Sequence, residues 1–350
     1  MADIQKQFKE FHDEIKLKRF TENKTLREKR DIITDKINDG IKDKFGDDAP
    51  TLEFFDQGSY ALDLGIKPAG GDYDIDEGVI FDLYKEDYVD PTSAKKWIRD
   101  IMEGHTSTPP NIKNPCVTIT YSIDEDSVYH VDLPVYFNSL YDSKLYLAWG
   151  KEYASSENKS WELSDPKGLI EHVKYRFSGE DKKQFKRVVR YLKKWKDNCF
   201  STSGNEMPPS IGITVAACEK FEPYKEYNYL SGKESYNDLE SLIRFTNTFI
   251  GLFSLVLDDG EFKRSIALDL PVEPYSNIFE KMTIKQMDNF YNKLSALNTA
   301  LQEAQEDPDP HTACKILENH FGSKFPIPAS AEARYKADKS NAPSSNSAKG

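Results

Sequence analysis

Long apolar runs are missing from this sequence of 350 residues. The longest nearly apolar run, residues 249–257, is broken by Gly251 and Ser254 and is much shorter than the roughly 18 residues that a membrane-spanning helix needs. The first residues, Met-Ala-Asp-Ile-Gln-Lys, also lack the basic and then apolar order of a secretory signal. We therefore expect a cytoplasmic protein with no membrane partner.

Cysteine is scarce, and acidic residues outnumber basic ones. The four cysteines, at positions 116, 199, 218 and 314, show no Cys-x-x-Cys or Cys/His ligand spacing, so we expect buried thiols and neither a disulfide scaffold nor a structural zinc site. Lys and Arg number 47 against 59 Asp and Glu, which gives a formal net charge of −12. Tight, sequence-independent binding to long DNA needs clustered cations, so this class of partner is not expected.

Apolar periodicity divides the chain into two halves, as its length also suggests. The first half alternates between helical spacing and short β-prone runs, with helices expected at 3–45 and 91–102 and strands at 51–55, 75–81, 116–123 and 128–137. Helical patterns dominate the second half, at 166–177, 181–198, 211–219, 236–257 and 284–305. We predict an α+β protein with a mixed core over residues 1–164 and a helical lobe over residues 165–328. In residues 329–350, 15 of 22 are Ala, Ser, Asn, Pro or Gly, which predicts a disordered tail.

One segment combines residue types that bind phosphate and metal ions. Gln57-Gly58-Ser59 follows a predicted strand, and Asp74-Ile75-Asp76 begins 15 residues after Ser59. Side chains two positions apart on a strand point to the same face about 6.5–7 Å apart, so Asp74 and Asp76 can face one site. Two Mg²⁺ ions would fit between such carboxylates and a triphosphate, and Mn²⁺ can substitute. Asp132, among apolar neighbours on a later predicted strand, is the candidate third carboxylate.

Each part of this pattern is common by itself. A Gly-Ser pair is frequent in loops, and an isolated Asp-x-Asp is usually a solvated surface pair. The order of the parts, with a third aspartate, favours catalysis by nucleotidyl transfer. Gly58 would let the backbone approach phosphate, Ser59 would donate a hydrogen bond, and Asp132 would act as a metal ligand or as a base near an attacking ribose hydroxyl.

These motifs resemble a known superfamily. Gly58-Ser59, Asp74-x-Asp76 and Asp132 are similar to the motifs of polymerase-β-type nucleotidyltransferases, which include poly(A) polymerases and oligoadenylate synthetases. The second half is similar to the bacterial cGAS/DncV-like nucleotidyltransferases in the stretches 161–167, 190–195, 209–211 and 321–326. The resemblance covers residues 50–328 in the right order and implies a bilobal polymerase-β-like core followed by a helical lobe.

The resemblance also implies an activity and further site residues. It points to a synthase of cyclic di- or trinucleotide messengers in an anti-phage system of the CBASS type, with nucleoside triphosphates as substrates and ATP or GTP favoured. Lys193 and Ser210 match the family's triphosphate contacts, while Ser164 and Asp165 lie where a helical lid faces a base. Plainer interpretations remain open, since Lys193 could lie on a solvated helix face and Ser210 could cap a helix.

Four more residues near the motifs have two interpretations each. Trp195 and Tyr191 are more typical of a packed core than of base stacking. His130 lies two positions before Asp132, so on a strand both would share a face and His130 could support the site. Tyr60 fits a position near the nucleotide or a role in packing.

The resemblance also implies protein partners. In some CBASS operons an E1/E2-like protein conjugates the nucleotidyltransferase through its C-terminus, which Gly350 on a Ser/Ala-rich arm would suit, and the messenger activates an effector. The zinc thumb of vertebrate cGAS, a His followed by clustered Cys, is missing from the sequence, so activation by double-stranded DNA is not expected. A template-independent RNA-tailing or oligoadenylate enzyme and an inactive nucleotide-binding scaffold are the alternatives. Base identity, ring size and linkage are not determined by the sequence.

Overall fold

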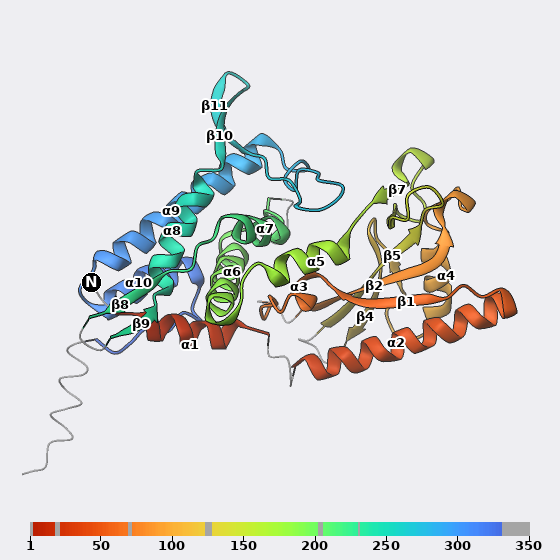
Figure 1. Cartoon of the computed structure of the whole chain (residues 1–350), viewed down its shortest axis with the longest axis horizontal. Coiled ribbons are helices and arrows are strands. Elements are labelled where there is room, and N and C mark those ends of the chain that lie inside the picture. Colours follow the sequence, from red (N-terminus) through yellow and green to blue (C-terminus); the bar gives the residue numbers. More distant parts are fainter. Residues whose placement is uncertain are drawn as a thin grey trace, which may run out of the picture.

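The computed structural model describes residues 3–17, 22–68, 72–122, 128–201, 206–229 and 232–330. A sheet with covering helices forms one half of the molecule and a helical assembly forms the other, with α5 between them (Figure 1). The predicted α+β fold is therefore confirmed. Within the described ranges, no helix is both long and apolar enough to span a membrane. Most of the predicted tail, residues 331–350 with Gly350, lies outside the described residues.

The elements follow one another along the chain in mixed order. The α-helices are α1 Gln5–Ile15, α2 Glu22–Phe45, α3 Gly58–Ala61, α4 Ser93–Met102, α5 Pro166–Tyr175, α6 Gly179–Cys199, α7 Ser210–Lys220, α8 Asp238–Ile250, α9 Ile284–Glu306 and α10 Pro310–Phe321. The strands are β1 Leu52–Gln57, β2 Asp72–Tyr84, β3 Asn111–Ile112, β4 Cys116–Ser122, β5 Val128–Asn138, β6 Tyr146–Trp149, β7 Ser160–Leu163, β8 Lys225–Asn228, β9 Lys233–Tyr236, β10 Phe253–Asp258 and β11 Glu261–Ile266. Short 3₁₀ helices lie at Gly46–Asp48, Lys85–Asp87 and Ser156–Asn158.

A seven-stranded sheet forms the first half. Its strand order is β1-β2-β5-β4-β3, and β6 extends it by pairing with β5 and with β7. Strands β2 and β5 run parallel, whereas the other pairs are antiparallel. The β2–β5 register places Asp76 opposite Asp132, so residues far apart in sequence meet across neighbouring strands.

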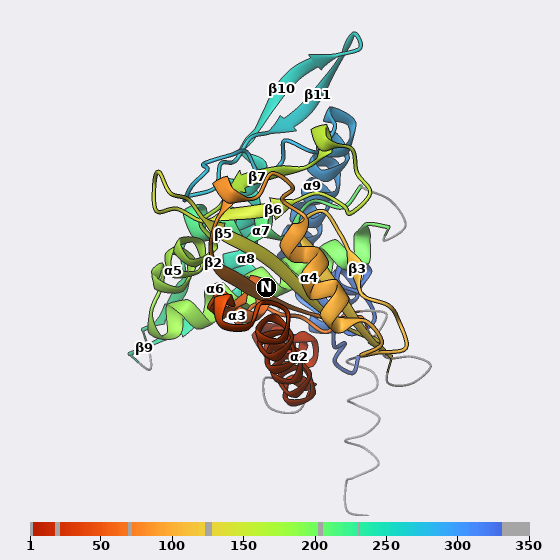
Figure 2. The ribbon, with the colours of Figure 1, turned by 90° about the vertical axis from the view of Figure 1, so that its right-hand side faces the viewer.

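The two faces of this sheet have different environments. On β2, Ile75 and Val79 are fully buried and pack in one core with Ile37 of α2 and Ile98 of α4. Figure 2 shows α4 in front of the sheet, with α2 beside it. Because side chains alternate along a strand, the neighbouring positions of β2 point to the opposite face, toward the second half of the molecule.

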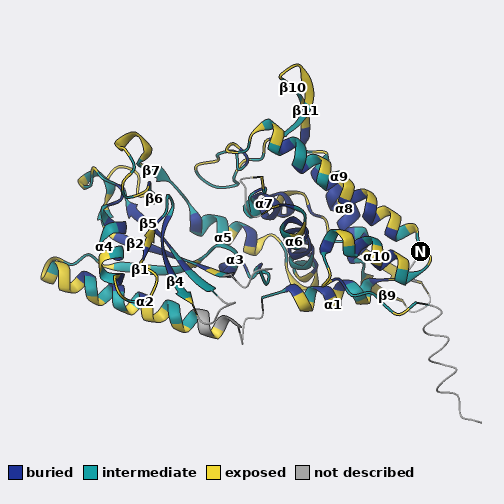
Figure 3. Ribbon diagram, turned by 180° about the vertical axis from the view of Figure 1, so that it is seen from behind, coloured by how far each residue is buried: buried dark blue, intermediate teal, exposed yellow. Residues whose placement is uncertain are grey.

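The second half has its own apolar core, built from α1 and from α5 to α10. Helix α6 lies within it, and its Tyr191 and Trp195 are no more than 1% exposed, which confirms the prediction of core residues. The hairpin β10–β11 extends from this half, and Figure 3 shows exposed residues along it.

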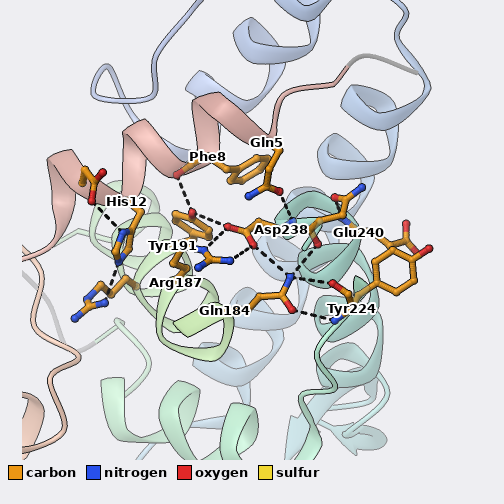
Figure 4. Close-up of polar contacts among 12 residues, drawn as sticks. Gln5, Phe8, His12, Gln184, Arg187, Tyr191, Tyr224, Asp238 and Glu240 are labelled. Carbon is orange, nitrogen blue, oxygen red and sulfur yellow. Dashed lines mark hydrogen bonds and ion pairs between the residues drawn. The ribbon is translucent and has the colours of Figure 1, made fainter. Parts of the chain in front are cut away.

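Helix α1 is joined to the second half through a buried carboxylate. Asp238, fully buried at the start of α8, accepts hydrogen bonds from Arg187 at 2.6 and 2.8 Å and from the Tyr191 hydroxyl at 3.1 Å (Figure 4). The Tyr191 hydroxyl also lies 2.7 Å from the Phe8 carbonyl, and Gln5 accepts from the Asp238 backbone N–H. This network ties α1, α6 and α8 together.

Two secondary-structure predictions are corrected. The periodic stretch 3–45 forms two helices, of which α1 packs in the core of the second half and α2 in that of the sheet. The helix predicted over 236–257 ends at Ile250, and residues 253–258 form β10. A short apolar run fits both the helical and the strand spacing of apolar residues. Here pairing with β11 stabilises the strand.

Candidate active site

Three carboxylates meet on the open face of the sheet. Asp74 and Asp76 of β2 and Asp132 of β5 each offer an oxygen atom, and these atoms lie within 4.8 Å of one another. Asp74 is exposed at the rim, whereas Asp76 and Asp132 are half-buried. The predicted meeting of the three aspartates is confirmed, and the cluster could hold a metal ion.

The three carboxylates repel one another, and neighbouring positive charges compensate this repulsion only in part. Loss of hydration, together with Asp132, raises the pKa of Asp74 to about 6. Burial, followed by the charges of Asp74 and Asp132, raises the pKa of Asp76 to about 7. Asp132 accepts from the Thr118 hydroxyl and lies 3.4 Å from the Lys113 ammonium. Such a set of oxygen donors suits hard cations of the Mg²⁺ class, whose charge would relieve the repulsion.

A glycine brings the backbone against this cluster. Strand β1 ends at Gln57, and Gly58, with φ of +62°, begins the short helix α3 where the sequence had predicted a loop. A Cβ atom on Gly58 would lie 2.0 Å from Oδ2 of Asp76. Only glycine fits here, because its backbone conformation is left-handed and the space is taken by the carboxylate.

Gly58→Ala should therefore lower turnover by about 10²-fold, since the clash must displace Asp76 or the turn by a sizeable fraction of an ångström. The measurement is the initial rate of product formation at saturating substrate. Gly46→Ala is the matched control, because Gly46 has φ of +60° but open space around its Cβ position. Equal rates for Gly58→Ala and the wild type would contradict this account of the turn.

A cavity of about 480 Å³ opens beside the cluster. Both halves of the molecule contribute to its wall. The wall includes Gln57, Gly58, Ser59, Tyr73, Asp74 and Asp76 from the sheet half, and Pro166, Leu169, Ile170, Lys193, Asp197, Ser210, Ile211 and Thr214 from the helical half. The predicted turn, two of the aspartates and the predicted pair Lys193 and Ser210 thus share one cavity.

Helix α6 supplies a cation, Lys193, to this cavity. Lys193 is buried, and its ammonium donates to the Leu64 carbonyl at 3.2 Å. Ser210 accepts from Lys196 at 2.5 Å and is the first residue of α7, whose N-cap is Pro209. The alternatives of a solvated lysine and a capping serine are therefore wrong.

The same helix also fixes the loop that follows the glycine turn. Lys186 binds Oδ2 of Asp63 at 2.7 Å, and Arg190 donates to the Asp63 carbonyl at 2.5 Å and to the Gly65 carbonyl at 3.3 Å. With the bond from Lys193, three α6 cations contact the segment 63–65 directly after α3.

The charge of Lys193 should make triphosphate binding depend on pH. Burial, followed by Lys196 and Arg190, lowers the pKa of Lys193 to about 7. An ammonium with a lowered pKa is lost as the pH rises, so affinity for a non-hydrolysable triphosphate should fall above pH 7, by up to about tenfold per unit. Titration calorimetry between pH 6.5 and 8.5 measures this dependence.

Two variants test whether Lys193 causes the pH dependence of triphosphate affinity. Lys193→Met should bind the triphosphate weakly at pH 7, and its affinity should depend less on pH than that of the wild type. Lys194→Met, one position along the helix, should keep the pH dependence of the wild type. Parallel slopes for the wild type and Lys193→Met would contradict the assignment.

The remaining predicted residues lie around the cavity or away from it. Asp165 caps α5 by accepting from the Gly168 N–H at 2.8 Å, and the Ser164 backbone N–H donates to the Leu145 carbonyl. Neither of them is among the described residues that line this cavity, so their contact with a base stays a prediction. His130, opposite Asp74 in the β2–β5 register, hydrogen-bonds Thr120.

The structure decides the open interpretation of Tyr60 and adds one residue, Asp197, to the cavity. Tyr60 is buried in the sheet-half core, and its hydroxyl accepts from Arg27, so its interpretation as a packing residue is confirmed. Asp197 lines the cavity and was not predicted. The signal was its position one helical turn after Lys193, which is informative only once Lys193 is known to be buried.

Residues 52–136, which contain the glycine turn and all three aspartates, match the family model described as "Cyclic GMP-AMP synthase DncV-like, nucleotidyltransferase domain". This part of the chain is similar to the nucleotidyltransferase domain of cGAS/DncV-like enzymes. The chain is 28% identical over 223 residues to a cyclic GMP-AMP synthase of Escherichia albertii. The alignment covers 61% of the chain and 46% of that relative, and so spans about half of the relative's length.

Solved structures share the fold of this chain. Vibrio cholerae DncV cyclic AMP-GMP synthase, in complex with nonhydrolyzable GTP, aligns with a TM-score of 0.68 and 16% identity over 92% of this chain and 99% of that one. Bradyrhizobium diazoefficiens CdnG, in complex with GTP, aligns with a TM-score of 0.66 and 14% identity over 93% and 97%. The similarity to both extends over the sheet half and the helical half.

Proposed function

We propose that the protein is a metal-dependent synthase that joins nucleoside triphosphates into a cyclic oligonucleotide messenger, with release of pyrophosphate. The observation that supports this most directly is the convergence of Asp74, Asp76 and Asp132 beside a cavity that also contains the Gly58–Ser59 turn and Lys193. Anionic metal ligands and a buried cation around one cavity match a substrate that carries both a metal ion and a polyphosphate.

Each residue has a role in this proposal. Two divalent ions, Mg²⁺ or in its place Mn²⁺, held by the three aspartates would neutralise the triphosphate and activate the attacking hydroxyl. The Gly58 backbone and the Ser59 hydroxyl would contact phosphate, with Gln57 beside them. Lys193 and Ser210 would hold the triphosphate from the helical side.

The remaining assignments concern the nucleoside and the division of the chain. Asp132 would bind a metal ion or receive the proton of the ribose hydroxyl, while Thr118 and Lys113 keep its carboxylate in place. Ser164 and Asp165 would lie near a base. We also propose the lobe boundary at residues 164 and 165, since α5 begins directly after them at Pro166.

Product analysis tests the proposal. The purified protein is incubated with all four triphosphates and Mg²⁺, treated with phosphatase, and the resistant products are identified by mass spectrometry. A cyclic product, purine-containing by our proposal, is expected. Linear oligomers or primer extension would favour the tailing enzyme, and nucleotide binding without turnover would favour the scaffold.

The biological setting is part of the same proposal. A cyclic messenger would act on an effector in anti-phage defence, and the E1/E2-like partner would join to Gly350. Expressing the protein with a candidate E1/E2-like enzyme and determining the mass of the C-terminal peptide tests the second point. A free Gly350 under conditions in which that enzyme is active would contradict it.

A further inference from the structure

A second group of metal-ligating side chains lies on the helical half, outside the aspartate cluster. His172 of α5 and Cys218 and Glu219 of α7 each offer one ligand atom, and these atoms lie within 4.8 Å of one another. Nε2 of His172 is 2.7 Å from Oε1 of Glu219, and Cys218 is fully buried beside them. Sequence spacing could not reveal this group, because His172 and Cys218 are 46 positions apart.

The donor set differs in kind from that of the active site. The aspartate cluster offers oxygen atoms alone, whereas this group combines a thiol, an imidazole and a carboxylate. Zn²⁺ is bound by that combination in proteins, while Mg²⁺ prefers oxygen atoms. By themselves, His172 and Glu219 form an ordinary surface pair and Cys218 packs in the apolar core; the feature that distinguishes the group is that a thiol, an imidazole and a carboxylate come within 4.8 Å of one another.

We propose that His172, Cys218 and Glu219 bind one Zn²⁺-class ion, with a water molecule as fourth ligand, and that this ion fastens α5 to α7. The thiol proton passes to water when the sulfur atom binds the metal. A dication with one thiolate and one carboxylate forms a neutral unit, which lowers the electrostatic cost of a site beside the apolar core.

The two helices that carry this group, α5 and α7, also form part of the cavity wall, so an ion bound between them would affect the cavity. Both helices form part of the cavity wall, α5 through Leu169 and Ile170 and α7 through Ile211 and Thr214. His172 lies one helical turn after Leu169, and Cys218 one turn after Thr214. An ion that joins the two helices there holds these two walls at a fixed separation, independently of the Mg²⁺-class site.

The test uses the full chain carrying Asp74→Asn and Asp76→Asn, which removes two ligands of the other cluster and makes the result independent of the proposed activity. Cobalt(II) is the spectroscopic probe, and Zn²⁺ the competitor. We expect one equivalent of Co²⁺ to give a thiolate-to-cobalt charge-transfer band that Zn²⁺ removes. Zn²⁺ should also raise the thermal midpoint of this variant.

Further substitutions in the same background locate the ion. Cys218→Ser should abolish the band, and His172→Gln, at a partly exposed position that leaves the core intact, should weaken binding by at least about tenfold. Cys199→Ser is the matched control and should keep the band, because Cys199 lies outside the group at the end of α6. No thiolate band, a band lost with Cys199, or equal affinity in His172→Gln would overturn the proposal.

Discussion

Replacing both Asp74 and Asp76 by asparagine should reduce synthesis of the nucleotide product by about 10³-fold or more. Charge stabilisation by bound metal contributes several kcal/mol to such reactions, and each 1.36 kcal/mol corresponds to a factor of ten. The measurement is product formed per enzyme over several hours, with Mg²⁺ and with Mn²⁺. Asp82→Asn is the matched control, since Asp82 lies exposed on the same strand and outside the cluster.

The same double variant should remain folded and, without divalent cations, be at least as stable as the wild type. The pKa values of Asp74 and Asp76 are raised, so their ionisation weakens the folded state as the pH rises from about 4 to 7. The asparagines do not ionise, so the double variant avoids this loss of stability. The thermal midpoint of the double variant should therefore exceed that of the wild type by an amount that grows from about pH 4 to 7. Retained turnover, or unfolding of the double variant, would show that the aspartates have another role.

Asp238→Ala should lower the free energy of unfolding by about 3–5 kcal/mol. Removing one partner of a buried ion pair leaves the other charge uncompensated, and Arg187 donates two hydrogen bonds to this carboxylate. Tyr191 and Gln184 lose a partner as well. Urea unfolding followed by circular dichroism measures the effect.

A second substitution distinguishes the cost of the uncompensated charge from the cost of lost packing. Arg187→Met in the Asp238→Ala background removes the uncompensated charge and should recover part of the loss. Glu240→Ala, on the same helix but at a partly exposed position, should cost less than about 1 kcal/mol. No recovery in the double variant would mean that packing dominates.

Much of the sheet half could be predicted because strand alternation is a local property. Ile75 and Val79 point to the core, so Asp74 and Asp76 had to point to the other face. The meeting with Asp132 was a hypothesis of another kind, since it required β2 and β5 to be neighbours in a given register. The combination of residue types indicated the site before the register was known.

The helical half was less predictable because its important contacts are tertiary. Periodicity identified α1 and α2 as amphipathic but could not show that they pack in different cores. The buried ammonium of Lys193 beside the cavity donates to the carbonyl group of Leu64, more than 100 positions away. The cap of α5 at Asp165 was not predicted, although an aspartate directly before a proline is a local signal for the start of a helix.

Helix α6 joins two parts of the molecule that are otherwise unrelated in sequence. Lys186, Arg190 and Lys193 hold the segment after the glycine turn, while Arg187 and Tyr191 hold Asp238 and, through it, α1. A single inserted residue between 186 and 193 would rotate the following side chains by about 100°. The contacts to residues 63–65 and the attachment of the N-terminal helix would then be lost together. This stretch therefore has almost no freedom to vary in length, in contrast to the projecting β10–β11 hairpin.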